Sequence, residues 1–285
     1  MKLIVDSGST KTDWCFADSR DNYTRIKTDG INPAVQSIEE IRSVVQSQML
    51  TEAQKQSVDC AALESVFFYG AGCNKEFGVV VEQILRETIG EKATVSVDSD
   101  LLAAARALCG TQPGIACILG TGSNSCFFDG SEIQKNTSAL GYILGDEGSG
   151  SVLGRLFLNG ILKGTLPSFL RDEFFDEYGL NQADIIKRVY HSPMPNRFLA
   201  SLSRFILPRI DNEALAELVI RNFENFIVNN LYNYSDTAPV INAVGSVAYF
   251  YRTQLEQAAK RHGYRIGKIL KSPLEGLLEY HFANK

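Results

Sequence analysis

The first hundred residues alternate between short apolar runs and longer stretches in which apolar positions recur every three or four residues. The short runs predict strands at 3–5, 14–17, 66–69 and 93–97, with 23–29 as a candidate strand of a meander. The longer stretches predict helices at 36–50, 79–89 and 100–109. Strands that alternate with helices indicate α/β layering around a mostly parallel sheet.

The second half of the chain opens in the same way and then becomes largely helical. A new strand set begins at Ile115, and the clearest helix is expected at 212–235, where apolar residues form one stripe. We expect a strand at 239–244 and then helices at 246–262 and 274–282. Turn residues cluster at 111–114. They predict a first domain of 1–113 and a second of 114–285, whose last helix is a candidate to pack back on the first domain.

Length and charge narrow the class of protein. A chain of 285 residues is long enough for roughly two domains. Its 33 acidic residues outnumber its 28 basic ones, which argues against nucleic-acid and anionic-membrane partners because both need a basic surface. No apolar run approaches the ~20 residues that cross a bilayer. The first apolar run ends at Asp6, so we expect no signal peptide and a cytoplasmic location.

Cysteine and histidine spacing gives no support for a zinc site. The 6 cysteines form no CxxC pair, and the 3 histidines lie far apart in the sequence. Structural zinc sites draw their ligands from closely spaced pairs. We therefore expect free thiols.

The two halves of the chain share a local pattern. A shift of 114 residues aligns 4–10 with 118–124, and both segments contain a strand, a turn of small residues and a second strand. The pattern predicts two hairpins whose tips expose backbone N–H groups, which can form a concave anion site. The first tip, 6–12, adds hydroxyls, one lysine and the carboxylate of Asp6, which could hold hydrated Mg²⁺. An ordinary tight hairpin is the alternative for this tip.

The second tip, Gly120-Thr121-Gly122-Ser123-Asn124, fits neither common phosphate-binding fingerprint. No helix pattern follows it, as a dinucleotide site requires, and no Gly-Lys-Ser/Thr follows at the spacing of a P-loop. Two hairpins that could each bind phosphate, one in each half of the chain, are more specific than either alone.

Three further segments place small or acidic residues where a strand or loop meets a helix. In 141–150, Asp146 and Glu147 lie between glycines before a helix pattern, so either they favour the helix N-terminus or the glycines let the backbone approach a ligand closely. Asp98 and Asp100 follow a strand, where α/β sheets bind ligands, but either could simply be an N-cap. The segment 240–248 is a strand, a Gly-Ser turn and a helix, which suits either ordinary packing or a nucleotide base.

Taken together, these segments resemble the N-acetylglucosamine kinase family, of the BadF/BadG-type ATPase group in the acetate and sugar kinase/heat-shock cognate/actin superfamily. The most specific pieces are LGTGSN at 119–124 and GDEGSG at 145–150, supported by DSGSTKTDW at 6–14 and GSVA at 245–248. The resemblance covers nearly the whole chain. It implies an α/β fold with two actin-like (ribonuclease H-like) domains and a central interdomain cleft. It also implies MgATP-dependent phosphorylation of an amino sugar at its 6-hydroxyl.

The resemblance also implies a role for each matching residue. Asp6 would hold Mg²⁺ through water, and Asp100 would be the general base. The implied sugar contacts are Asn32, Thr121, Asn124 and Asp146. The implied ATP contacts are Ser9, Thr10, Lys11, Thr12, Gly120, Thr121, Gly122, Ser123, Gly245 and Ser246.

Some choices stay open within this resemblance. The family pattern has small residues three and four positions after the base, which Asp100 meets and Asp98 does not, although Asp98 could raise the pKa of Asp100 by like-charge coupling. N-acetylglucosamine is the expected sugar, with N-acetylmuramic acid and glucosamine as alternatives. An ATPase activator of a CoA-ester dehydratase or reductase, a non-catalytic sugar sensor and a heat-shock-like chaperone are the competing functions. The resemblance also makes a homodimer plausible.

Overall fold

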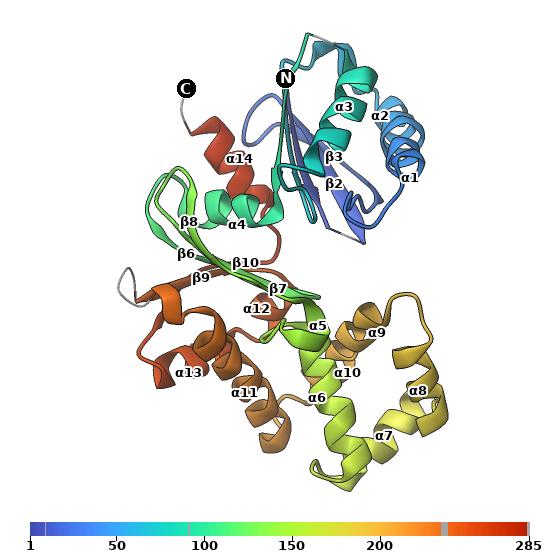
Figure 1. Ribbon diagram of the computed structural model, residues 1–285, viewed down its shortest axis with the longest axis vertical. Coiled ribbons are helices and arrows are strands. Elements are labelled where there is room, and N and C mark those ends of the chain that lie inside the picture. The colour runs from blue at the N-terminus through green and yellow to red at the C-terminus, as the bar shows by residue number, and fades with distance from the viewer. Residues whose placement is uncertain (9, 91, 235–238, 284–285) are drawn as a thin grey trace. The chain divides into compact units, whose positions relative to one another are not determined.

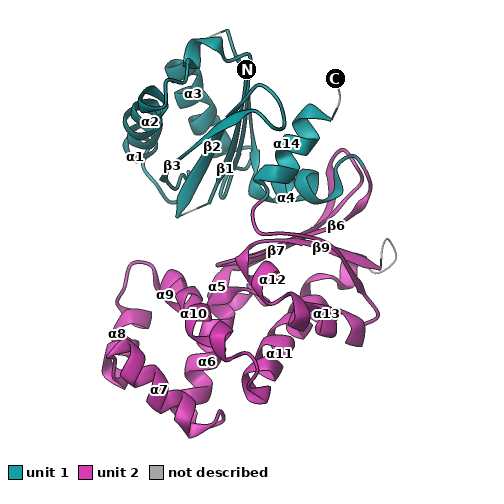
Figure 2. Ribbon diagram, turned by 180° about the vertical axis from the view of Figure 1, so that it is seen from behind, with its two compact units in different colours: residues 1–111, 273–285 teal, residues 112–272 magenta. Residues whose placement is uncertain are grey.

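A computed structural model describes residues 1–8, 10–90, 92–234 and 239–283 of the chain. By their contacts, the residues fall into two compact units, Met1–Thr111 with Pro273–Lys285, and Gln112–Ser272 (Figure 2). The chain therefore passes between the units twice, after Thr111 and after Ser272. We refer to them as unit 1 and unit 2.

Unit 1 is built on a mixed five-stranded sheet (Figure 1). Its strands are β1 (Lys2–Ser7), β2 (Lys11–Ala17), β3 (Tyr23–Asp29), β4 (Ser65–Gly70) and β5 (Thr94–Ser99), in the order β3-β2-β1-β4-β5. The pairs β1–β2 and β2–β3 are antiparallel, whereas β1–β4 and β4–β5 are parallel. The expectation of a mostly parallel sheet was therefore wrong, because the first three strands form a meander that contributes as many pairings as the βα units.

Helices cover both faces of this sheet. On one face, α1 (Ile38–Arg42), the π-helical η1 (Ser43–Met49), α2 (Leu50–Lys55) and α3 (Gly78–Ile89) pack on a core that includes Trp14 and Phe68. The helices α4 (Asp100–Cys109) and α14 (Leu274–Phe282) contact each other and β1 on the other face. A short 3-10 turn, η2 (Cys60–Ala62), precedes β4.

Unit 2 repeats the topology of the first sheet. Its strands are β6 (Gly114–Leu119), β7 (Ser123–Phe128), β8 (Ile133–Thr137), β9 (Val240–Val244) and β10 (Arg265–Leu270), in the order β10-β9-β6-β7-β8. Here β6–β7 and β7–β8 are antiparallel, and β6–β9 and β9–β10 are parallel. Each strand thus has a counterpart in unit 1, and the two hairpins predicted from the shared pattern occupy equivalent places. The prediction of an α/β fold with two actin-like halves is confirmed.

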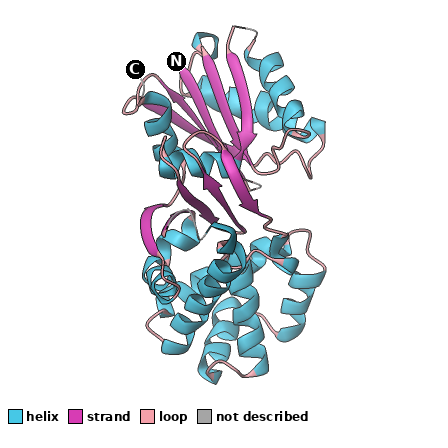
Figure 3. Cartoon of the chain, turned by 60° about the vertical axis from the view of Figure 1, so that its left-hand side comes forward, coloured by secondary structure: helices cyan, strands magenta, loops and turns pink. Residues whose placement is uncertain are grey.

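Helices make up the rest of unit 2 (Figure 3). Before β9 they are α5 (Gly141–Leu144), α6 (Gly150–Lys163), α7 (Ser168–Tyr178), α8 (Gln182–Tyr190), α9 (Pro195–Ser201), α10 (Ser203–Ile206), η3 (Leu207–Arg209), α11 (Glu213–Asn230) and η4 (Tyr232–Tyr234). After β9 come α12 (Ser246–Phe250) and α13 (Arg252–Arg261). Phe157, Phe174 and Phe205 pack edge to face or tilted in the core. Within the described ranges, none of the helices has the length and apolar character that a bilayer crossing requires.

Candidate functional site

The first hairpin brings acidic residues into one row across the sheet of unit 1. Asp6 on β1 lies opposite Asp13 on β2 and Tyr69 on β4, and Tyr69 lies opposite Asp98 on β5. Because side chains at paired positions share a face, these four residues lie on the face that α4 and α14 contact. The N–H of Gly8 donates to the carbonyl of Lys11 at 3.0 Å and closes the tip. Thr10 and Lys11 are exposed there, and Ser9 lies outside the described residues.

The base of this hairpin is fixed by buried hydroxyls on the opposite face. The hydroxyls of Ser7 and Thr12, both fully buried, lie 2.7 Å apart. Ser7 Oγ also accepts from the N–H of Ile31 at 3.0 Å. The Thr12 hydroxyl therefore meets Ser7 and not the exposed tip, so an interaction of Thr12 with phosphate would rest on its backbone.

Asp13 pairs with both cations beside the hairpin. Its carboxylate is almost fully buried and pairs with Lys11 Nζ at 3.1 Å and with an Arg25 nitrogen at 3.0 Å. Burial opposes ionisation, but the hydrogen bonds and charges of Arg25 and Lys11 outweigh it and lower the pKa of Asp13. Sequence reasoning missed this residue as part of the site. Alternation along β2 puts it on the same face as Lys11, which is a signal that could have found it.

The carboxyl of Asp6 is strongly perturbed. Burial, together with the negative charges of Asp13 and Asp100, raises its pKa to about 7. A bound cation would stabilise the charged form of this carboxyl. Mg²⁺ in proteins is commonly held by one or two carboxylates plus waters and phosphates. The donors at Asp6 therefore fit a hydrated Mg²⁺. Across the described ranges, no three potential metal-ligating side chains cluster into an all-protein cage.

Asp98 and Asp100 lie in different surroundings. Neither is the N-cap of α4: Ser99 is, and its side chain accepts from the N–H of Leu102. Asp98 is held by the Ser96 hydroxyl at 3.0 Å and by Arg106 at 3.5 Å. Asp100 is the first residue of α4, and burial raises its pKa against the effect of backbone N–H groups at the helix start. A raised pKa suits a general base that works near neutral pH.

Asn32 lies beside the loop that follows β4. Its Oδ1 accepts from the N–H of Ala34 at 3.1 Å. A Cβ at Gly72, which has φ +75°, would overlap Oδ1 of Asn32 at 2.1 Å. A side chain at position 72 would therefore displace Asn32, and glycine there lets the two loops meet.

In unit 2, the second hairpin is joined to the loop that contains Asp146. The N–H of Gly120 donates to the carbonyl of Gly122 at 3.0 Å across the tip. Two backbone bonds then run from the start of α6, from Gly150 N–H to the Gly120 carbonyl at 2.8 Å and from Ser151 N–H to the Thr121 carbonyl at 3.1 Å. These bonds fix the tip to the start of α6. Thr121 itself is exposed, while Gly120 and Gly122 are partly exposed.

Asp146 sits in a strained backbone conformation next to this tip. Its φ is +53°, in the left-handed region that non-glycine residues rarely adopt. Oδ1 accepts from the N–H of Ser123 at 3.1 Å, and a Cβ on Gly122 would approach Oδ2 at 3.0 Å. Burial and then the charge of Glu147 raise the pKa of Asp146, while the Ser123 N–H opposes the shift. Strain of this kind is typical of functional loops.

Asn124, also predicted to lie near the sugar, makes local hydrogen bonds. Its Oδ1 accepts from the N–H of Ser125 and from Asn136 Nδ2, each at 2.9 Å. The bond from Asn136 joins β8 to β7. Both bonds use Oδ1 of Asn124, so a sugar contact can be proposed for its Nδ2.

Gly245 contacts the second hairpin from the end of β9. Its φ is +126°, and a Cβ there would lie 2.3 Å from the carbonyl oxygen of Leu119 and 3.1 Å from the nitrogen of Gly120. Only glycine permits this approach without moving the hairpin. Ser246, the first residue of α12, is exposed beside it. The structure thus brings three predicted segments of unit 2 together: 119–124, 145–150 and 245–246.

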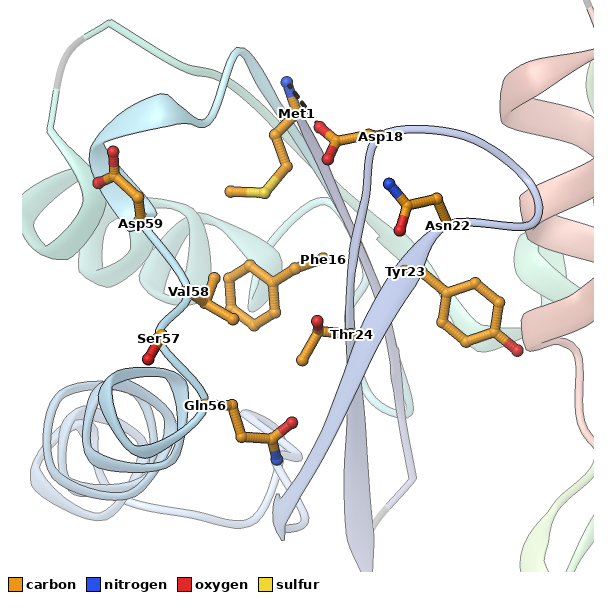
Figure 4. Close-up of a pocket in the computed structure, with 10 residues that line it drawn as sticks. All are labelled: Met1, Phe16, Asp18, Asn22, Tyr23, Thr24, Gln56, Ser57, Val58 and Asp59. Atoms are coloured by element: carbon orange, nitrogen blue, oxygen red, sulfur yellow. Dashed lines mark ion pairs between the residues drawn. The ribbon is translucent and has the colours of Figure 1, made fainter.

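The pocket in Figure 4 belongs to unit 1 and does not include Asp6 or the tip of the first hairpin. It has a volume of about 190 Å³ and is lined by Met1, the ends of β2 and β3, and the segment 56–59. Met1 comes just before the start of β1, whereas Asp6 lies near the end of β1. The pocket is therefore at the opposite ends of the strands from Asp6. The N-terminal amine of Met1 pairs with Glu64 at 3.4 Å.

Two sheets of one topology, each with a hairpin at the same place, define the actin-like fold that is found in sugar kinases. A candidate N-acetylglucosamine kinase from Porphyromonas gingivalis is 47% identical, with a TM-score of 0.95, over 100% of this chain and 99% of that one. The chain belongs to the N-acetylglucosamine kinase family.

Two more distant structures show the same fold. A candidate N-acetylglucosamine kinase from Chromobacterium violaceum is 20% identical, with a TM-score of 0.70, over 98% of each chain. A ROK family glucokinase from Streptomyces griseus, solved with glucose and AMPPNP, is 14% identical, with a TM-score of 0.53, over 98% of this chain and 97% of that one. No protein-family model and no curated protein matched the chain.

Proposed function

We propose that this protein transfers a phosphoryl group from ATP to the 6-hydroxyl of an N-acetylated amino sugar, with N-acetylglucosamine as the substrate. The observation that carries the proposal is the bond from Ser123 N–H to the Asp146 carboxylate. It ties a hairpin suited to phosphate directly to a carboxylate suited to sugar hydroxyls, and a kinase needs both groups at one site. The full-length likeness to a candidate N-acetylglucosamine kinase supports the choice of sugar.

In this proposal, Asp100 accepts the proton of the attacking hydroxyl. General-base catalysis of this kind contributes ~10²–10⁴-fold. Asp98 pairs with Arg106 near the end of β5, two residues before Asp100, and takes no part in the proton transfer. Asn32, Thr121, Asn124 and Asp146 bind the sugar, so that the hydroxyl is held for in-line attack.

The nucleotide is bound by the two hairpins and the β9–α12 turn. The tips at 8–12 and 120–123 contact the phosphates, Lys11 adds a positive charge, and Gly245 and Ser246 lie against the adenosine. The N–H groups of Gly8, Gly120 and Ser123 already donate within the protein, so the phosphate contacts fall to other groups of the two tips. A glucokinase of the same fold was solved with AMPPNP, which supports ATP as the nucleotide. Mg²⁺, held through water by Asp6, would neutralise charge on the β- and γ-phosphates.

The first experiment is a coupled assay of ADP release. MgATP is offered with N-acetylglucosamine, N-acetylmuramic acid, glucosamine or glucose, and without sugar. We expect turnover with N-acetylglucosamine. Equal ADP release with and without sugar would instead support an ATPase, and fastest turnover with another amino sugar would replace the substrate.

A pair of variants tests the base. Asp100→Asn is expected to lower kcat by at least ~100-fold with little change in KM for either substrate, because only the proton acceptor is lost. Asp98→Asn is the matched control, two residues earlier on β5, and should keep most of the kcat. The assignment fails when the control loses turnover and Asp100→Asn does not.

A further inference from the structure

One buried amide in unit 2 has no place in the proposed chemistry. Asn222 lies in the middle of α11 and is fully buried, on the same helix as the core residues Phe223 and Phe226. An apolar residue would suit this surrounding better, since burying an amide is costly unless its polar atoms are hydrogen-bonded. Asparagine at this position therefore needs a specific reason.

Both ends of the amide bind the backbone of the loop that follows Asp146. Asn222 Oδ1 accepts from the N–H of Gly148 at 3.0 Å, and its Nδ2 donates to the carbonyl of Ser149 at 3.1 Å. Gly148 has φ +78°, and a Cβ there would lie 2.8 Å from Cβ of Phe226. The loop is thus pressed against α11 at Gly148 and bonded to it on either side of one peptide unit.

The two hydrogen bonds of Asn222 act where the predicted binding segments 119–124 and 145–150 meet. On one side, Ser149 N–H donates to the carbonyl of Asp146 at 3.1 Å, which closes the turn that holds Asp146 in its left-handed conformation. On the other side, Gly150 and Ser151 donate to Gly120 and Thr121 in the hairpin tip. A displacement of residues 148 and 149 would therefore move both the Asp146 carboxylate and the tip.

The same helix holds the loop at a second point. The Asn229 amide donates to Glu147 Oε1 at 3.0 Å, and the Asn230 amide donates to Glu147 Oε2 at 3.3 Å. Water can replace these exposed or partly buried bonds, whereas loss of the Asn222 amide would leave buried groups of the loop without partners. Three asparagines of α11 nevertheless bind three consecutive loop residues, 147–149.

We propose that Asn222 is a positioning residue: by fixing the backbone of Gly148 and Ser149, it orients Asp146 for the sugar and Gly120 and Thr121 for phosphate. The kinetic part of this inference rests on the proposed function. Its structural part, that the amide fixes the hairpin tip through the loop, is independent of any substrate.

The test compares Asn222→Leu with Tyr251→Phe. Leucine fills a similar volume but leaves the Gly148 N–H and the Ser149 carbonyl buried without partners. Tyr251 is fully buried in the same unit, and its hydroxyl donates to the carbonyl of Ser203, away from the loop. The control therefore removes a buried hydrogen bond of unit 2 without touching 145–151.

Hydrogen exchange read by mass spectrometry gives the first result. In Asn222→Leu, peptides that cover 119–124 and 146–151 should exchange at least roughly tenfold faster, because they lose a buried anchor. In Tyr251→Phe these peptides should exchange as in the unaltered protein. Unchanged exchange at both segments in Asn222→Leu overturns the inference, whatever the reaction is.

Kinetics give the second result. Asn222→Leu should raise KM for the amino sugar by roughly tenfold and lower kcat, whereas Tyr251→Phe should leave both KM values unchanged. Loss of stability with both KM values intact would show a purely structural role and overturn the inference. If Asn222→Leu does not fold, Asn222→Asp, which keeps an acceptor for Gly148, is examined in the same two assays with the same criteria. An unaltered protein without sugar-dependent turnover would refute the proposed function only, and the exchange result would then decide the positioning role.

Discussion

The N–H of Ser123 donates to the carboxylate of Asp146 at 3.1 Å. This one bond joins the first residue of β7 to a loop that lies 23 positions further along the chain. Asp146 can therefore serve two purposes at once: one oxygen fixes the hairpin, and the other remains available for a sugar hydroxyl. The two purposes can be separated by substitution.

Asp146→Asn and Asp146→Ala should differ in their effect on ATP. The amide oxygen of asparagine can still accept from Ser123, so the hairpin keeps its shape while the sugar loses a charged acceptor, an interaction worth about 1.5–3 kcal/mol. We expect KM for the sugar to rise by roughly 10–100-fold in Asp146→Asn, with KM for ATP nearly unchanged. Alanine removes both contacts, so KM for ATP should rise as well. Initial-rate kinetics with each substrate varied in turn measure both values, and equal KM values for ATP in the two variants would contradict this division.

Gly245→Ala should destabilise the protein far more than Gly263→Ala. Both glycines have positive φ, at +126° and +78°, but an added Cβ meets nothing within 4 Å at Gly263 and lies 2.3 Å from the Leu119 carbonyl at Gly245. Backbone strain alone costs about 1–2 kcal/mol, and overpacking adds about 1–3 kcal/mol. Thermal unfolding followed by circular dichroism gives both free energies of unfolding. Similar losses in the two variants would mean that Gly245 is chosen for its φ and not for its approach to the second hairpin.

Much of the fold could be predicted from local patterns. The shared strand–turn–strand pattern of 4–10 and 118–124 led to two equivalent hairpins, and the sheets around them have one topology. The candidate meander strand at 23–29 is confirmed, since β3 pairs antiparallel with β2. The balance of the whole sheet was misjudged: the alternation of strands and helices predicted a mostly parallel sheet, whereas half of its strand pairs are antiparallel.

The residues of the candidate site also differ in how far they could be predicted from the sequence. Residues in short glycine-rich motifs, such as Asp6 and Asp146, are visible because the motif departs from ordinary strand and helix patterns. Asn222 is not visible, since a single asparagine beside an apolar stripe could equally face solvent. Its role depends on which loop packs against α11, and that is decided by tertiary structure. Asp13 is an intermediate case. Its spacing from Lys11 could be read from the sequence, but its burial could not.

Asp6→Asn should make the protein more stable while it abolishes activity. The pKa of Asp6 is raised from 3.8 to about 7, so the folded state resists losing this proton. The resulting penalty grows as pH rises from about 4 to 7 and is constant above, where it amounts to at most roughly 4 kcal/mol. Asparagine carries no charge and avoids the penalty. Denaturant unfolding at pH 8 in the presence of a chelator should therefore give a higher free energy of unfolding for the variant, and the gain should shrink towards pH 4.

Asp13→Asn is the matched control for Asp6→Asn and should have the opposite effect. Its pKa is lowered by Arg25 and Lys11, so its charge stabilises the folded state at pH 8. Asparagine carries no charge, so the substitution removes both ion pairs and the stabilisation that they give. A loss of stability in both variants would show that Asp6 is held as an ordinary structural carboxylate, and the argument for a cation at this position would fall.

His281 should make the protein sensitive to mild acid. Its ring stacks on Phe67 with a centroid distance of 3.9 Å, and its Nε2 lies 2.9 Å from the Tyr69 hydroxyl. Burial, with the positive charges of Arg106 and Lys2, lowers its pKa from 6.5 to about 3. In the unfolded chain this histidine takes up a proton below pH 6.5, whereas in the folded protein it does not until about pH 3, so stability is lost as pH falls through this range.

A glutamine at this position removes the titration and can keep a hydrogen bond to Tyr69. Between pH 7 and pH 5, we expect the unaltered protein to lose about 2 kcal/mol more free energy of unfolding than His281→Gln does. Denaturant unfolding at several pH values measures the two slopes, and carboxylates that titrate in both proteins cancel in the difference. Parallel slopes would mean that His281 can bind a proton in the folded state, and α14 would then be held on the sheet by its apolar contacts, without a requirement for a neutral histidine.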